Sequence, residues 1–266
     1  MRARFLLISR NVYKQKTMKK LFLALLAVLP SLAVPAAGKV PSGAVGTVQY
    51  EVRYKLGGVT SKVATATISL ESAKWEDNPA YHTRAVIKAS SVFRLFMNAE
   101  YLADAYISTS GLEPLFFTNP FKKNGKECKI EYVYDSASRL IRSETVRPPS
   151  DPVSETFPLD GRTLDLLSLL QYVRFQEFSD GKPVSLHLLM SGKSCPATLT
   201  LQGVDTERFP DKPAERFLLK MNGRGLMENG SGDEITVWRS TGSDRRILGL
   251  ETALGSSATM SVSVKP

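Results

Sequence analysis

The sequence predicts a mainly β protein of the α+β class, in which a large curved antiparallel sheet holds one long helix in its hollow. Apolar and polar residues alternate over about a dozen short segments, and turn residues separate these segments. One long segment, residues 163–178, has the composition of a helix. Many short strands and one isolated helix favour a single large antiparallel sheet.

The strands are predicted from their alternation and from the turns between them. Residues 45–56 and 63–70 flank Gly57-Gly58, a tight hairpin turn, and Asn124-Gly125 gives a second hairpin signal. The Pro-rich residues 148–152 are predicted as a loop. The remaining predicted strands are residues 81–89, 101–108, 115–121, 127–134, 140–146, 183–190, 197–204, 216–221, 234–239, 247–252 and 258–264.

The predicted helix begins with Thr163 as its N-cap and ends before Gly181 and Pro183. Asp165 is then expected in the first turn, where the helix dipole favours an anion. The apolar residues of this segment surround the helix and do not form one stripe, so it needs burial on more than one side. The hollow of a curved sheet would supply that burial. The pattern also allows a second, short helix over Ser90 to Met97.

The net charge of +9, from 35 basic and 26 acidic residues, is concentrated at the start of the chain. Residues 1–36 hold seven of the basic residues and no acidic one. The rest therefore carries 28 basic and 26 acidic residues, a net charge of +2. This near-neutral balance argues against a nucleic-acid partner.

The leader has the order of a secretory signal. Met18-Lys19-Lys20 precedes the apolar residues 21–29, and Pro30 and small residues follow. This apolar run is about half of the ~20 residues that span a bilayer, so no transmembrane segment is expected once the leader is removed. Because the signal is complete from Met18, residues 1–17 are interpreted as an upstream start read as protein.

Cleavage is expected after Ala36 or Gly38, which gives a signal peptide over residues 1–36 and a single β domain over residues 37–266. No cysteine follows the apolar run, so a lipoprotein is not expected. The expected location is the periplasm of a Gram-negative cell.

Export would place the two cysteines of the chain in an oxidising compartment. An oxidising compartment allows Cys128 and Cys195 to form a disulfide, and a bond between them would close a large loop. The alternative is two unrelated buried thiols.

Few residues suit catalysis. The chain has two histidines, His82 and His187, which are too few for a three-histidine metal site and are not spaced as helical ligands. Both are interpreted as structural or surface residues. Nucleophile-elbow and zinc-protease motifs are absent from the sequence. No enzymatic activity, cofactor or metal is therefore predicted.

Several landmarks recur in one order and together resemble a known family. They are Tyr50-Glu51-Val52, residues 92–96 before the strand that contains Tyr101, residues 112–115, the Leu-rich helix, residues 235–238, Arg245-Arg246-Ile247 and residues 254–256. This order is similar to that of the DUF3108 family of exported bacterial proteins. The resemblance implies a LolA-like half-open antiparallel barrel with helices on its concave face, and it implies no catalytic residue. The chain departs from the family pattern at residues 247–250, where Leu248 follows Ile247 in place of a proline, and at the small residues 256–259.

The sequence favours a binding function over a catalytic one. A half-barrel with an apolar helix inside can enclose a cavity for a lipid, an acyl chain or a lipidated protein in the cell envelope. The candidate cavity walls are Phe93, Phe96, Met97, Leu166, Leu170, Val173 and Trp238. The alternative interpretation is that these residues only fill the core. Two other functions stay open: an envelope scaffold that recruits a protein partner through an edge strand or surface patch, and a hydrolase.

Overall fold

Strands account for most of the chain. The computed structural model describes residues 40–91, 100–123, 126–159, 162–209, 211–222, 233–254 and 257–265. The described part belongs to one compact unit, Ala36–Pro266. Alternate burial along β6 (Lys126–Asp135) places one row of its side chains in the core and the next row outside.

The described residues form a short 3₁₀ helix η1 (Ser42–Ala44), one helix α3 (Leu166–Phe175) and fifteen strands. With β6, the strands are β1 (Gly46–Leu56), β2 (Val59–Trp75), β3 (Asn78–Ala89), β4 (Glu100–Ser108), β5 (Pro114–Lys123), β7 (Leu140–Val146), β8 (Val153–Pro158), β9 (Thr163–Leu164), β10 (Pro183–Met190), β11 (Lys193–Asp205), β12 (Ala214–Met221), β13 (Glu234–Ser240), β14 (Ile247–Ala253) and β15 (Ala258–Val264).

These strands make one sheet, which confirms the predicted antiparallel architecture. Its order is β8-β7-β6-β5-β4-β3-β2-β1-β15-β14-β13-β12-β11-β10-β9, and every pair is antiparallel except β9 with β10. The two edge strands, β8 and β9, follow each other in the chain between Pro158 and Thr163. Five residue steps span at most about 18 Å, so the two edges lie close together and the sheet curls into an incomplete barrel.

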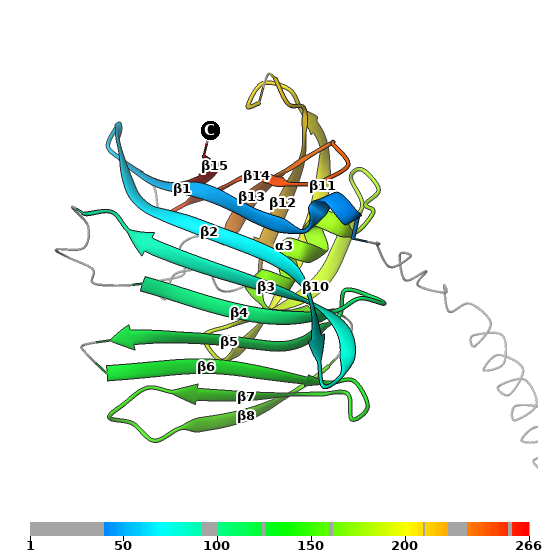
Figure 1. Cartoon of the computed structure of the whole chain (residues 1–266). Coiled ribbons are helices and arrows are strands. Elements are labelled where there is room, and N and C mark those ends of the chain that lie inside the picture. The colour runs from blue at the N-terminus through cyan, green and yellow to red at the C-terminus, as the bar shows by residue number, and fades with distance from the viewer. Residues whose placement is uncertain are drawn as a thin grey trace, which may run out of the picture. The chain divides into compact units, whose positions relative to one another are not determined.

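The gap between the two edges of the sheet is bridged at its other end by direct contacts. The turn between β10 and β11 reaches β6, where the backbone N–H of Gly192 donates to Tyr132 Oη at 2.9 Å. A Cβ on Gly192 would lie 2.8 Å from Thr145 Oγ1 on β7, so glycine allows this close approach. Figure 1 shows the resulting arrangement, with α3 between strands β1–β8 and strands β10–β15.

The helix is buried on more than one side, as its composition predicts. Leu169, Tyr172 and Val173 pack into the cluster made by β10 to β14, whereas Leu167 packs with aromatic side chains of β5 and β6. Both faces of α3 therefore support the core. The helix fills the hollow of the sheet.

The bounds of the helix differ from the prediction. Asp165 is the N-cap and accepts hydrogen bonds from the backbone N–H groups of Leu167 and Ser168. Thr163 was expected to be the cap, but it begins β9 and pairs with His187 of β10. The helix ends at Phe175, three residues earlier than predicted.

Most strand predictions are confirmed, and two strands were missed. The Gly57-Gly58 turn has positive φ angles of 54° and 89° and joins β1 to β2 as expected. The predictions missed β8, because residues 153–158 are largely exposed and lack an apolar row, and β9, because it is short. Asn124-Gly125 and most of the short helix predicted over Ser90 to Met97 lie outside the described residues. No described helix has the length and apolar character needed to cross a membrane.

Candidate binding site

Two of the predicted cavity walls on α3, Leu170 and Val173, pack in the core. Val173 is 1% exposed within the cluster of β10 to β14, and Leu170 packs against both halves of the sheet. Leu166, at the start of the helix, is half-buried. Phe93, Phe96 and Met97 lie outside the described residues. For Leu170 and Val173, the structure therefore matches the alternative interpretation, in which these side chains fill the core.

Trp238 does not lie with the helix residues, which corrects the prediction. Its neighbour Val237 faces α3, and alternation along β13 turns Trp238 to the outer face of the sheet. There Trp238 packs with Ala214 and Leu248, and Phe209 contacts it edge to face, with ring centroids 6.1 Å apart.

Buried polar groups fix both ends of α3. At the N-terminal end, the fully buried Asp165 also accepts from the hydroxyl groups of Ser168, at 2.6 Å, and Tyr134, at 3.2 Å. Burial raises the pKa of Asp165, and the hydrogen bonds from Ser168, Tyr134 and Leu167 act in the opposite direction. The carboxylate serves as a helix cap inside the core.

At the C-terminal end, Arg239 of β13 donates hydrogen bonds to carbonyl groups at the end of the helix. Its Nη1 donates to the carbonyl oxygens of Val173 at 2.6 Å, Arg174 at 3.2 Å and Gln176 at 2.9 Å. Its Nε donates to Glu215 at 2.7 Å. A cation at this end complements the helix dipole, so Arg239 stabilises the position of α3.

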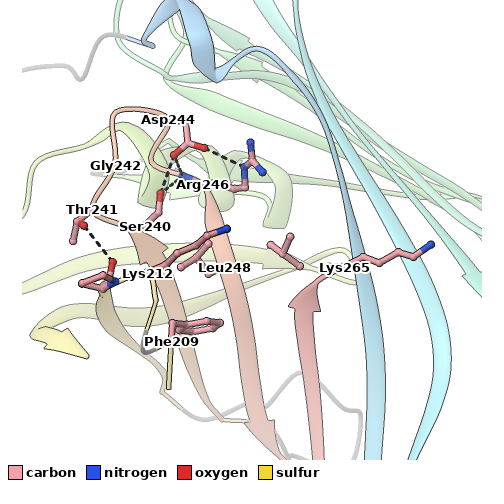
Figure 2. A pocket seen from close by; sticks show the side chains of 11 residues that line it. Phe209, Lys212, Ser240, Thr241, Gly242, Asp244, Arg246, Leu248 and Lys265 are labelled. Atoms are coloured by element: carbon pink, nitrogen blue, oxygen red, sulfur yellow. Dashed lines mark hydrogen bonds and ion pairs between the residues drawn. The ribbon is translucent and has the colours of Figure 1, made fainter. Parts of the chain in front are cut away.

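The outer face of the sheet has a pocket in the same region. A pocket of about 780 Å³ lies where the β11–β12 connection, the β13–β14 turn and the end of β15 meet (Figure 2). We call it the outer pocket. It is lined by Phe209, Lys212, Pro213, Ser240, Thr241, Gly242, Asp244, Arg246, Leu248, Val264 and Lys265.

The wall of the outer pocket is apolar where it rests on the sheet. Leu248 is buried against Trp238, and Phe209 and Val264 pack on the same cluster. Gly249 makes room for Phe209, because a Cβ there would lie 3.4 Å from Cζ of that ring and 2.9 Å from the carbonyl oxygen of Val262. The apolar wall thus depends on a glycine in the middle of β14.

The rim of the pocket is polar and is held in place by its own hydrogen bonds. Ser240 Oγ donates to Asp244 Oδ1 at 2.9 Å and accepts from the backbone N–H of Arg246 at 2.9 Å. The Nε of Arg246 lies 3.1 Å from Asp244 Oδ2. Thr241 Oγ1 donates to the carbonyl oxygen of Pro213 at 3.2 Å, which joins the turn to the β11–β12 connection.

The helix also supports this rim from inside the sheet. The guanidinium of Arg174 donates to the carbonyl oxygens of Asp244 at 3.3 Å and Arg245 at 3.4 Å, and to that of Ala44 at 3.0 Å. The turn that lines the outer pocket is therefore anchored to α3.

Sequence reasoning missed the outer pocket. Its lining comes from four separate segments, and none of them has a recognisable motif.

The disulfide prediction is wrong for this structure. Cys128 on β6 and Cys195 on β11 are both buried thiols that are not bonded to each other. The Cys128 thiol donates to the carbonyl oxygen of Lys126 at 3.8 Å, and Cys195 packs in the cluster of β10 to β14. Compartment and residue count suggested the pair, but they carry no information on distance.

The histidines occupy ordinary places in the sheet. His82 on β3 is partly buried; its Nδ1 lies 2.8 Å from Glu71 Oε1 and its Nε2 lies 2.7 Å from Asp104 Oδ1. Its ring stacks on Tyr106, with centroids 4.7 Å apart. His187 lies on β10 and pairs with Thr163. Within the described part of the chain, no three His, Cys, Asp or Glu side chains gather as a metal site.

Comparison with known proteins identifies the family. Residues 49–263 match the family model described as "Protein of unknown function (DUF3108)". No curated protein matches the chain. A solved structure that is similar is the crystal structure of a beta-barrel-like protein of the domain of unknown function DUF1849 from Brucella abortus. It has 11% sequence identity and a TM-score of 0.49, and the match covers 86% of this chain and 98% of that one. Because the family model spans most of the chain, the protein belongs to the DUF3108 family.

Proposed function

We propose that this protein is a non-catalytic binding protein of the cell envelope, and that it holds the apolar part of a small ligand in the outer pocket. The observation that carries the proposal is the apolar wall formed by Phe209, Leu248 and Val264 in a pocket of about 780 Å³. Ligand sites generally occupy roughly 300–1,000 Å³ and combine apolar walls with a few polar groups.

Burial of a hydrocarbon chain against this wall would supply the affinity. Each buried methylene contributes about 0.8 kcal/mol, so a short chain laid along Leu248 and Phe209 gains several kcal/mol before the cost of ordering it. The wall is already built around Trp238 and Gly249.

The polar groups of the pocket favour binding without chemistry. The one carboxylate among the lining residues, Asp244, already binds Ser240 and Arg246. The hydroxyl of Ser240 is in turn held between Asp244 and the backbone N–H of Arg246. Both groups hold the turn in shape, which is a structural task.

The proposed place of action is the periplasm, and it rests on the leader. Residues 21–29 are apolar, follow Lys19 and Lys20, and precede a run of small residues. Mass spectrometry of the protein recovered from a Gram-negative periplasm tests this step. An N-terminus at Ala37 or Lys39 supports export, and a chain recovered from the cytoplasm with its leader intact contradicts it.

The binding step is tested with a fluorescent fatty-acid probe and the variant Phe209→Ser. Phe209 is half-buried on a connection outside the sheet, so its loss leaves the core intact. We expect saturable binding to the natural protein and an affinity about tenfold lower in the variant, because the ring supplies much of the wall. Leu140→Ser on β7, where the leucine is 40% exposed, is the matched control. Equal affinity in Phe209→Ser and Leu140→Ser would reject the outer pocket as the site.

A further inference from the structure

We infer that the ligand of the outer pocket carries an anionic head, a carboxylate or a phosphate, next to its apolar chain. The inference rests on the proposed function and adds the chemical class of the ligand. It is drawn from the charges that border the apolar wall: Lys212, Arg246 and Lys265.

The cations outnumber the acids that could neutralise them. Asp244 is the one carboxylate among the lining residues, and it faces Arg246 across 3.1 Å. Lys212 and Lys265 form no ion pair with any described residue. The lining therefore has a net charge of +2, from three cations and one anion, which favours an anion and disfavours a cation.

The placement of these charges suits an amphiphile. Figure 2 shows the side chain of Lys212 beside Leu248, whereas Lys265, a lining residue at the end of β15, extends away from Leu248 towards β1 and β2. Both lysines are exposed, so their ammonium groups stay in water while the wall accepts an apolar chain. A molecule with a hydrocarbon tail and an anionic head would satisfy the wall and the rim together.

At two other places on the sheet, the charged side chains are paired. On the outer face of β2 to β4, the charges are already matched: His82 lies between Glu71 and Asp104, and Arg84 lies 3.6 Å from Asp104. At β1 and β2, Glu51 takes both Arg53 and Lys62. The charges at these two places are thus paired, unlike Lys212 and Lys265 of the outer pocket.

The experiment compares dodecyl amphiphiles that differ only in their heads, each below its micelle concentration, by isothermal titration calorimetry. The heads are phosphate, carboxylate, zwitterionic phosphocholine and cationic trimethylammonium. We expect the two anions to bind about tenfold more tightly than the zwitterion, and the cation to bind most weakly, because two exposed charges together supply roughly a factor of ten. A preference between phosphate and carboxylate then separates a phospholipid-like ligand from a fatty acid.

The double variant Lys212→Gln and Lys265→Gln removes the unpaired charges and keeps the wall. It should lower the affinity for dodecyl phosphate about five- to tenfold and leave the affinity for dodecylphosphocholine unchanged. The matched control removes two exposed lysines elsewhere, Lys55 and Lys74, and should leave both affinities unchanged. Added salt should reproduce the effect of the double variant on the natural protein.

The outcomes separate the two proposals. Saturable binding of all four heads with equal affinity would overturn the anionic head and leave the proposed function standing. Saturable binding of none of them would overturn both. Anion preference that survives in the double variant would also reject this inference, because the charge would then come from another site.

Discussion

The inner and outer faces of β13 and β14 differ in whether their charged side chains are paired. Inside, the guanidinium of Arg239 is 1% exposed, and its donors go to three helix carbonyls and Glu215. Outside, Lys212 and Lys265 border an apolar wall and pair with no described carboxylate. The inner face is therefore a packed core with its charges paired, whereas the outer face retains unpaired charge and apolar surface. These are the properties expected of a binding site.

The two faces are nevertheless connected. The turn that lines the outer pocket begins directly after β13, so Arg239 inside is followed by Ser240 on the rim. Arg174 of the helix also donates to the backbone of Asp244 and Arg245 in this turn. The buried helix therefore helps to hold the pocket in shape, although we propose that the ligand does not contact it.

Removal of the inner arginine should have the largest effect on stability. Arg239→Ala leaves Glu215 and the carbonyl end of α3 without their partner, and such losses cost about 3–5 kcal/mol in the free energy of unfolding. Urea denaturation measures this change. Lys220→Ala is the control, because it breaks the exposed pair with Glu234 and should cost less than about 1 kcal/mol. Equal losses in the two variants would show that Arg239 does not stabilise the helix.

High pH should cause the next largest loss of stability, through two buried tyrosines of the core, Tyr50 on β1 and Tyr132 on β6. Burial raises the pKa of Tyr50 and of Tyr132 from 10.0 to about 12. The unfolded chain loses these protons first, so the stabilisation is complete below pH 10 and is lost as the pH rises towards 12. The loss is at most about 3 kcal/mol for each tyrosine.

Unfolding monitored by circular dichroism across this pH range gives the measurement. Tyr50→Phe should flatten the decline, because the variant has one buried phenol fewer. Tyr54→Phe, on the same strand, is the control. A natural protein whose stability does not change between pH 10 and 12 would contradict the assignment.

The buried helix cap gives a smaller effect that separates charge from hydrogen bonding. Asp165→Ala leaves the N–H groups of Leu167 and Ser168 unpaired in the core and should cost about 2 kcal/mol. Asp165→Asn keeps an acceptor for them and should cost less than about 1 kcal/mol. Thermal unfolding of the two variants tests this order, and a more harmful asparagine would show that the carboxylate charge itself is required.

The outer face should respond least in stability and most in binding. In Gly249→Ala the new methyl group meets the carbonyl oxygen of Val262 and the ring of Phe209, so we expect a loss of about 1–2 kcal/mol. The same shift of Phe209 should lower the affinity for dodecyl phosphate. Gly43→Ala, which meets no atom within 4 Å, is the control. Unchanged affinity in Gly249→Ala would mean that the ring is not part of the site.

The strands and the burial of the helix could be predicted because alternation and composition report them directly. The cap could not be assigned between Thr163 and Asp165, since both residues are good N-caps and only the pairing of Thr163 with His187 decides between them. Trp238 was misplaced for a related reason. Both faces of β13 are covered, so Ile235, Val237 and Trp238 are all buried, and alternation alone does not tell which face meets the helix.

The site could not be predicted because it depends on how strands β12 to β15 and their connections pack. Phe209 and Lys212 lie about 50 residues from Val264 and Lys265 in the sequence, and the pairing of these neighbouring strands brings them to one pocket. The binding hypothesis therefore began from the one feature that sequence shows well, the apolar helix. In the structure, that helix serves the core.

The most direct test of the account locates a bound chain by NMR. A fatty acid with a nitroxide label on its tail is added to protein with labelled methyl groups, and line broadening is recorded before and after the nitroxide is reduced. We predict broadening at Leu248 and Val264 of the outer pocket, while Leu170 and Val173 beside the helix stay sharp. Broadening at Leu170 and Val173 with sharp signals from Leu248 and Val264 would place the ligand inside the sheet and contradict the account.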